Sequence, residues 1–198
     1  MKEQFSRTEM LIGNESVEKL KNSRVAVFGI GGVGGYVVEA LARAGVGHIT
    51  LVDSDKVDIT NINRQMPALV STVGQAKCDV VAARLRDINP DAEIVPLNMF
   101  VGAENIPALL DGGRFDFVVD AIDTLPQKGD LIVACWQRSV KIVSSLGAGA
   151  KGDLSAIRRG DLWRSEHCVL GKNVRRLLRE YRGRYKLPVI YSMEDARK

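Results

Sequence analysis

The chain has 198 residues, of which 45% are apolar and 26% charged, and its formal net charge is +4. This composition suits one globular domain with a sizeable core and leaves no need for disorder. No apolar run of about 18 residues and no signal-like N-terminus occurs, so we expect a soluble, cytoplasmic protein without membrane contact. Cys78, Cys135 and Cys168 lack C-x-x-C spacing, which argues against a disulfide framework and against zinc.

The first recognisable unit is a strand, a glycine-rich turn and a helix. An apolar run over 25–28 predicts a buried strand, which ends at the glycines of "GIGGVG". Gly29, Gly31 and Gly34 fit G-x-G-x-x-G, in which glycines permit a tight turn and let backbone N–H groups approach phosphate. Apolar residues at helical spacing follow over 37–42, so a phosphate would lie at a helix N-terminus. The alternative is a glycine-rich turn without a ligand.

A second strand, "HITLVD" over 48–53, completes a βαβ unit. Its last residue, Asp53, stands where an acidic residue reaches a ribose hydroxyl in nucleotide-binding folds. These features predict an adenine nucleotide but do not separate NAD from ATP.

The polar loop after this strand and the start of the next helix carry groups suited to a triphosphate. They are Asp55, Asn61, Asn63, Arg64, Gln65 and Lys77. Arg64 can present a planar fork to phosphate oxygens, and Lys77 a compact positive charge. A dehydrogenase needs little here beyond a ribose contact, so the loop favours ATP. The alternatives are that Arg64 pairs with Asp58 and that Lys77 is a solvated helix residue.

Helices and strands continue to alternate along the chain. We expect a helix over 74–88, a strand over 93–98, a short helix over 104–110, a strand over 115–123, a helix over 126–138 and a strand over 141–149. This order predicts an α/β fold with a Rossmann-like, doubly wound, mainly parallel sheet and helices on both faces.

We expect a single domain over residues 1–198. Its parts are an N-terminal helical arm over 1–23, a nucleotide-binding core over 24–150 and a basic segment over 151–198. Between residues 158 and 186 there are ten Lys or Arg and three acidic residues, a local net charge of +7.

Four arginines of the basic segment are candidate RNA contacts. Arg175, Arg176, Arg179 and Arg182 fall within two turns of an expected helix, with Trp163, Tyr181 and Tyr185 interleaved. Such a pattern suits RNA phosphates and stacked bases. A solvated helix face is the simpler alternative.

Two aspartates stand near the end of the strand expected over 115–123. Asp120 and Asp123 belong to "VVDAIDT", and ligands bind at the carboxyl ends of strands in open α/β sheets. Asp123 can hold Mg²⁺ together with substrate phosphates, or it can cap the following helix.

Five segments resemble the ubiquitin-activating-like adenylating family: "FSRTEMLIG", "VAVFGIGGVGG", "LVDSDKVDITNINRQ", "VGQAK" and "VVDAIDT". The resemblance covers nearly the whole chain. It implies a site in which Gly29, Gly31, Gly32 and Gly34 cradle ATP phosphates, Asp53 binds ribose, and Asn61, Arg64, Gln65 and Lys77 contact the triphosphate region. It also implies that Asp123 holds Mg²⁺, and that Arg7 reaches the γ-phosphate of the partner subunit's ATP in a homodimer.

Within that family, "RTEMLIG", "SSLGAG" and "VIYSME" most closely resemble the branch that dehydrates threonylcarbamoyladenosine in the tRNA anticodon loop. The resemblance implies that the threonyl carboxylate attacks the α-phosphate of Mg·ATP, and that the carbamoyl oxygen then attacks the acyl adenylate as AMP leaves. Relatives in this branch usually continue beyond the end of this chain. Neither a zinc-binding cysteine set nor a thioester cysteine can be built here, which favours this branch, and no motif around Cys168 supports an activated thiol.

Three alternatives stay open at this point. One is adenylation of the C-terminal glycine of a ubiquitin-like sulfur carrier, with that protein or a sulfur-transfer protein as partner. The others are an NAD-dependent oxidoreductase and a non-catalytic nucleotide sensor.

Overall fold

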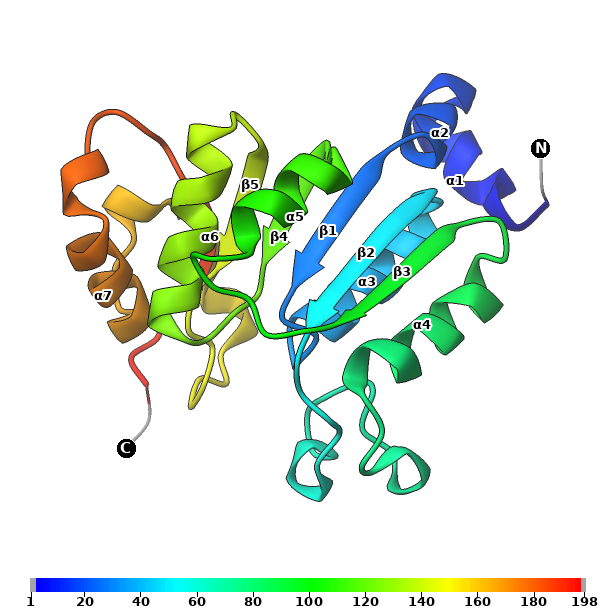
Figure 1. The fold of residues 1–198 in the computed structure, drawn as a ribbon, viewed down its shortest axis with the longest axis horizontal. Helices are drawn as coiled ribbons and strands as arrows, with labels where there is room; N and C mark the ends of the chain where they lie inside the picture. The colour runs from blue at the N-terminus through cyan, green and yellow to red at the C-terminus, as the bar shows by residue number, and fades with distance from the viewer. Residues whose placement is uncertain (1–2, 197–198) are drawn as a thin grey trace. The chain divides into compact units, whose positions relative to one another are not determined.

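Seven strands and the helices between them make up the regular structure of the computed structural model, which describes residues 3–196 (Figure 1). Two compact units form along the chain. Unit 1 comprises residues 3–100 and 113–117, and unit 2 comprises 101–112 and 118–196. The strands are mainly parallel, so the Rossmann-like α/β fold predicted from the sequence is confirmed.

Three parallel strands carry the core of unit 1. β2 (His48–Asp53) lies between β1 (Arg24–Phe28) and β3 (Glu93–Asn98) and pairs with both. Val27, Phe28 and Leu51 are fully buried, because the apolar runs that predicted these strands face a core. The strands expected over 48–53 and 93–98 have the predicted bounds.

Two helices of unit 1 pack side by side against these strands. They are α3 (Gly34–Ala44) and α4 (Lys77–Ile88). Glu39 of α3 accepts a hydrogen bond from Arg84 Nε of α4 at 2.7 Å and another from Arg43 Nε at 2.9 Å. These bonds, first that from Arg84, lower the pKa of Glu39 from 4.5 to about 2. The carboxylate therefore ties the two helices together.

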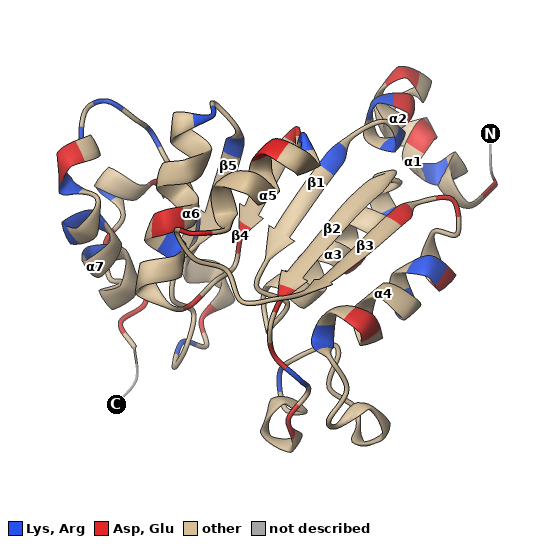
Figure 2. Ribbon diagram, in the orientation of Figure 1, with Lys and Arg blue, Asp and Glu red and all other residues tan. Residues whose placement is uncertain are grey.

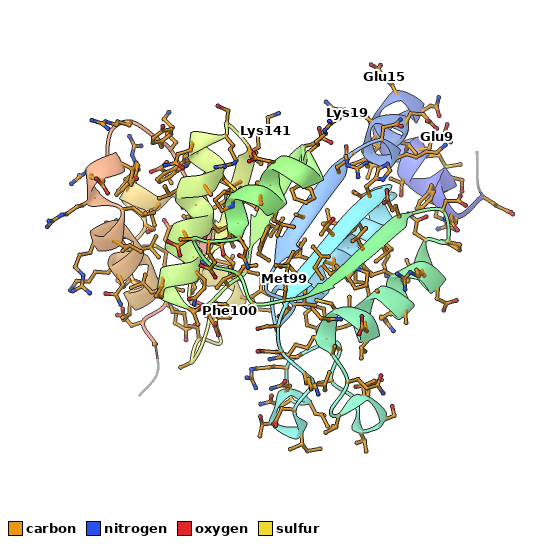
Figure 3. The ribbon with its side chains drawn as sticks, in the orientation of Figure 1. Glu9, Glu15, Lys19, Met99, Phe100 and Lys141 are labelled. Atoms are coloured by element: carbon orange, nitrogen blue, oxygen red, sulfur yellow. The ribbon has the colours of Figure 1, made fainter. Side chains whose placement is uncertain are left out.

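The segment before β1 folds into two short helices, α1 (Ser6–Ile12) and α2 (Asn14–Lys21), as expected for a helical arm. Glu15 and Lys19 of α2 project outward (Figure 3). Apolar Met10 and Leu11 of α1 are more than 80% exposed. The arm therefore presents both charged and apolar side chains on its surface.

Unit 2 contains the remaining four strands, in the order β4-β5-β7-β6. β5 (Lys141–Ser145) pairs in parallel with β7 (Pro188–Ser192), which pairs antiparallel with β6 (Ile157–Asp161). β4 (Phe117–Asp120) is the neighbour of β5. The helices of this unit are α5 (Ile106–Gly113), α6 (Leu125–Gln137) and α7 (Val169–Leu177).

Element boundaries differ from the predictions where long-range contacts decide them. The helix expected from residue 74 begins at Lys77, because Gly74 has a left-handed φ of +87° and Ala76 forms a β-bridge with Lys56. The strand expected over 115–123 is only β4, since the chain turns after Asp120. The short helix α5 begins two residues later than expected, and β5 ends at Ser145.

The prediction that one helix holds all four candidate arginines is wrong. α7 ends at Leu177, so Arg179 lies in a 3₁₀ turn and Arg182 follows it. The two tyrosines of this segment pack against Trp136 of α6. Tyr185 stacks on Trp136 with ring centroids 4.9 Å apart, Tyr181 packs against both rings, and Trp163 Nε1 donates to the Tyr185 carbonyl at 2.9 Å. Trp136, Tyr181 and Tyr185 therefore pack on one another, and Tyr185 remains 36% exposed.

The three cysteines are free thiols, and all are buried. Burial raises the pKa of Cys78 and of Cys135 to about 12. Cys168 Sγ accepts a hydrogen bond from the Gly171 N–H at 3.3 Å, so it caps the start of α7. Across residues 3–196, every helix is too short or too polar to cross a bilayer.

The Glu39 ion pairs predict a specific acid sensitivity. The unfolded chain takes up this proton near pH 4.5 and the folded chain only near pH 2, so the pairs stabilise the fold above pH 4.5 and lose this effect as pH falls toward 2. Because both arginine side chains are more than half exposed, screening by solvent limits the contribution to about 1 kcal/mol. We expect the free energy of unfolding of Glu39→Gln to fall less steeply between pH 4.5 and 2 than that of the native protein. Denaturant titrations between pH 2 and 7 measure this. Identical slopes for both proteins would contradict the assignment.

Candidate active site

The glycine-rich loop is fixed above the carboxyl ends of β1 and β2. Gly29 has φ +86°, a conformation that glycine adopts without strain, and its N–H donates to the Val52 carbonyl at 2.9 Å. The next N–H, of Ile30, donates to Asp53 Oδ2 at 2.6 Å. α3 begins at Gly34, so the N-terminus of this helix follows directly on the loop. The arrangement suits an anion such as phosphate.

Asp53 stands at the end of β2, as predicted. Its Oδ2 accepts from the Ile30 N–H and its Oδ1 from the Asp55 N–H at 2.8 Å. A carboxylate has about four acceptor positions, so these bonds orient it and leave room for a hydroxyl donor.

Arg64 and Gln65 lie directly beside the glycines. A Cβ on Gly32 would stand 3.6 Å from the Arg64 carbonyl oxygen, and a Cβ on Gly31 would stand 3.8 Å from Gln65 Nε2. Gln65 Oε1 is buried and has no hydrogen-bond partner within residues 3–196. A buried acceptor of this kind indicates that a ligand or water supplies the donor. The glycines and the polar loop therefore form one cradle.

The polar loop is held by its own hydrogen bonds. Arg64 Nη1 donates to the Thr60 carbonyl at 3.0 Å and to Asn63 Oδ1 at 2.8 Å, rather than pairing with Asp58. Asp58 accepts from the hydroxyl and N–H of Thr60, which lowers its pKa. Asn61 Oδ1 accepts from the Asp58 N–H at 3.1 Å. The loop is thus preformed around the guanidinium.

Lys77 is the first residue of α4 and is only 5% exposed. Its Nζ lies 2.8 Å from Asp55 Oδ2, and its N–H donates to the Asp55 carbonyl at 3.0 Å. The alternative of a solvated helix lysine is therefore wrong. The side chain of Asp55 is 65% exposed. The Lys77 ammonium is therefore held inside the protein by a carboxylate that remains in contact with water.

A buried charged cluster supports the chain after β4 in unit 2. Asp120 and Lys128 are fully buried, with Oδ2 and Nζ 2.8 Å apart. Asp120 also accepts from Ser144 Oγ at 2.6 Å and from the Ile122 N–H at 3.1 Å, and Lys128 donates to the Ile122 carbonyl at 2.7 Å. Asp120 is fully buried and bonded to three groups inside the protein. Of the two aspartates in "VVDAIDT", this leaves Asp123 to meet a ligand.

Asp123 follows this cluster and is exposed. Thr124 occupies the N-cap of α6, so the alternative that Asp123 caps the helix is wrong. Within residues 3–196 no three His, Cys, Asp or Glu side chains are grouped so as to hold a metal. One carboxylate is still sufficient for Mg²⁺ when phosphate and water oxygens complete its shell.

Lys128 and Ser144 were not singled out from the sequence. The available signal is a lysine on a helix that is otherwise rich in apolar residues, eight residues after an aspartate at a strand end. A charge in such a position needs a buried partner, and Asp120 is that partner.

The remaining predicted residues fall on two surfaces. Arg7 lies exposed on α1, and Glu9, two positions along, does not face it on a helix. Figure 2 shows Lys and Arg along α7 and the segment after it. There Arg175 Nη1 donates to the Ser165 carbonyl at 2.7 Å and to Ser165 Oγ at 2.6 Å, so it braces the fold. Arg176, Arg179 and Arg182 are exposed.

Comparison with known proteins gives one family. The model of the ThiF family matches residues 5–187. The tRNA threonylcarbamoyladenosine dehydratase of Bacillus subtilis is 47% identical, over 98% of this chain and 76% of that protein. The crystal structure of the Escherichia coli tRNA N6-threonylcarbamoyladenosine dehydratase with ATP superposes with a TM-score of 0.93 at 35% identity, over 98% of this chain and 82% of its own. The E. coli molybdopterin-synthase adenylyltransferase is 34% identical over 73% of this chain and 57% of that protein.

The buried cluster gives a stability prediction. Lys128→Met should lower the free energy of unfolding by about 3 kcal/mol or more, because it leaves the Asp120 carboxylate buried without a counter-charge. The double variant Lys128→Met/Asp120→Asn removes both charges and should recover a large part of the loss. Denaturant titrations of the three proteins test this. Equal destabilisation of the single and double variants would show that the pair is not coupled.

Proposed function

The chain belongs to the ThiF family, and on that premise we propose that it is an ATP-dependent tRNA threonylcarbamoyladenosine dehydratase. It activates the threonyl carboxylate of the modified adenosine as an acyl adenylate and then closes a ring with net loss of water. The observation that carries the proposal is the contact of the glycine loop with Arg64 and Gln65. Asp55, two residues after Asp53, holds the ammonium of Lys77. The two similar dehydratases extend over most of this chain.

The first step is attack of the carboxylate on the α-phosphorus of ATP, which expels pyrophosphate. The N–H groups of the glycine loop and the start of α3 hold phosphate oxygens, and Asp53 orients the ribose. Arg64 and Lys77 neutralise the charge that builds up on the phosphates. Asp123 would hold Mg²⁺, which would supply positive charge to phosphate oxygens.

The second step is attack of the carbamoyl oxygen on the activated carboxyl carbon. The C–O bond to AMP breaks, one proton leaves the carbamoyl group, and the ring closes. The protein contributes mainly position, because the phosphate is already a good leaving group. This account leaves no step that needs a reactive thiol, in keeping with the buried, high-pKa Cys78 and Cys135.

An adenylyltransferase acting on a sulfur carrier would use the same nucleotide residues. The relative of that kind is similar over a smaller part of this chain than the two dehydratases are. The exposed arginines after α7 favour a polyanionic substrate such as tRNA. A tRNA-modifying enzyme works where tRNA is found, so we place it in the cytoplasm.

The enzyme works as a homodimer in this proposal, and Arg7 acts on the site of the partner subunit. A twofold interface uses the same patch of both chains, so each Arg7 can complete the other subunit's site. A guanidinium supplied in trans stabilises charge on a transferring phosphorus centre. The exposed position of Arg7 on α1 leaves it accessible for this role.

The function is tested with purified protein, Mg·ATP and tRNA carrying threonylcarbamoyladenosine. We expect the nucleoside to lose one water by mass spectrometry, with AMP and pyrophosphate formed in equal amounts. Arg64→Ala and Lys77→Ala should fold normally and lower the rate by roughly 100-fold or more, the scale for loss of one charge-stabilising group. Lys56→Ala removes an exposed positive charge from the same loop at a residue with no role in the site, and it is the control. Binding of NAD without binding of ATP, or full activity of both variants, would refute the proposal.

The trans role of Arg7 is tested by complementation. Arg7→Ala and Lys77→Ala should each be nearly inactive alone. Mixed under conditions of subunit exchange, they should form heterodimers with one intact site and about half the activity of the native dimer. Exchange is verified with differently tagged subunits. A mixture that stays inactive after verified exchange would show that Arg7 does not act in trans.

A further inference from the structure

A surface pocket of about 530 Å³ lies beside α7 in unit 2. It is lined by Leu125, Asn173, Arg176, Leu177, Arg179 and Glu180. Nothing in the mechanism above uses this pocket. Its volume falls within the range of small-molecule and cofactor sites, so it is large enough for part of a nucleotide.

The charged groups of the lining suit an anion with one negative charge. Arg176 and Arg179 bring two guanidinium groups, and Glu180 brings one carboxylate, which leaves a net charge of +1. Asn173 adds an uncharged amide that can donate. A phosphodiester carries one negative charge, and guanidinium groups match its oxygens with paired N–H donors.

The backbone that carries these arginines is firmly held. Arg175 bonds to Ser165, and Val174 and Leu178 are buried, so the inner face of α7 is fixed. A side chain at Gly129 of α6 would collide with Leu177, which means that the two helices are in close contact. The aromatic stack on Trp136 fixes the segment that follows Arg179. Binding at the pocket therefore needs ordering of side chains only.

One residue of the pocket lining is also close in sequence to Asp123, the proposed Mg²⁺ ligand. Leu125 is the first residue of α6 and comes two residues after Asp123. The N-terminal end of a helix carries partial positive charge, which adds to the attraction for an anion.

We propose that the pocket lined by Arg176, Arg179 and Asn173 binds a backbone phosphate of the tRNA strand that carries the reacting nucleoside. This rests on the proposed function and narrows it. Of the four arginines predicted as tRNA contacts, two line this site, while Arg175 braces the fold.

Salt-dependent tRNA binding tests the proposal. Arg176→Ala and Arg179→Ala should each weaken binding of the substrate tRNA about tenfold at low salt, as expected for loss of a charge-assisted contact. Each should lower the slope of log affinity against log salt by about 0.7, the value for one single-strand phosphate. Arg184→Ala is the matched control, because it removes one exposed charge from the same segment but does not line the pocket. Its effects should be clearly smaller.

Asn173 gives a second, independent test. Asn173→Asp places a negative charge in the pocket and should weaken tRNA binding more than Asn173→Ala does. The affinity for Mg·ATP alone, measured by calorimetry, should not change in any of these variants. Loss of ATP affinity with intact tRNA binding would mean that the pocket serves the nucleotide and would overturn the proposal. Effects of Arg176→Ala and Arg179→Ala equal to those of Arg184→Ala would overturn it too, even if the native enzyme dehydrates tRNA as proposed.

Discussion

One hydrogen bond sets the geometry of the nucleotide cradle: the Ile30 N–H donates to Asp53 Oδ2 at 2.6 Å. It joins the glycine loop after β1 to the end of β2, and the pairing of the two strands fixes its length. The same carboxylate orients the Asp55 N–H, and Asp55 in turn holds Lys77. A single aspartate thus links three parts of the site, since the loop, the second strand and the start of α4 all depend on its position.

In unit 2 a buried charged cluster fixes the backbone after β4. The chain must leave β4 and turn into α6 while keeping Asp123 in solvent. Fully buried Asp120 accepts from the Ile122 N–H, fully buried Lys128 donates to the Ile122 carbonyl, and the buried Ser144 hydroxyl donates to Asp120. Such a cluster is costly to bury and gains little net stability over apolar packing, so its use here is more easily understood as fixing one backbone conformation.

The sequence was most informative where a local pattern coincides with burial. β2 and β3 have their predicted bounds because each is an apolar run between polar turns, and the cradle residues were predicted because their chemistry is readable in one continuous loop. Contacts between distant residues were not predictable in this way. The bridge from Ala76 to Lys56 shortens α4, Ser165 binds Arg175, and Trp136 stacks on Tyr185. Each depends on a partner that the local pattern does not reveal.

The burial of Lys77 beside an exposed aspartate has a consequence for affinity. Removing an ammonium from water is unfavourable, and here that penalty is already part of the folding equilibrium. In the proposed function, an incoming polyphosphate would meet a cation that is already out of water and held in one position. The polyphosphate would replace the Asp55 carboxylate as partner of the ammonium, and that carboxylate would return to full hydration, because 65% of its side chain already faces solvent. Binding would then exchange one counter-ion of Lys77 for another, with little reorganisation of the protein.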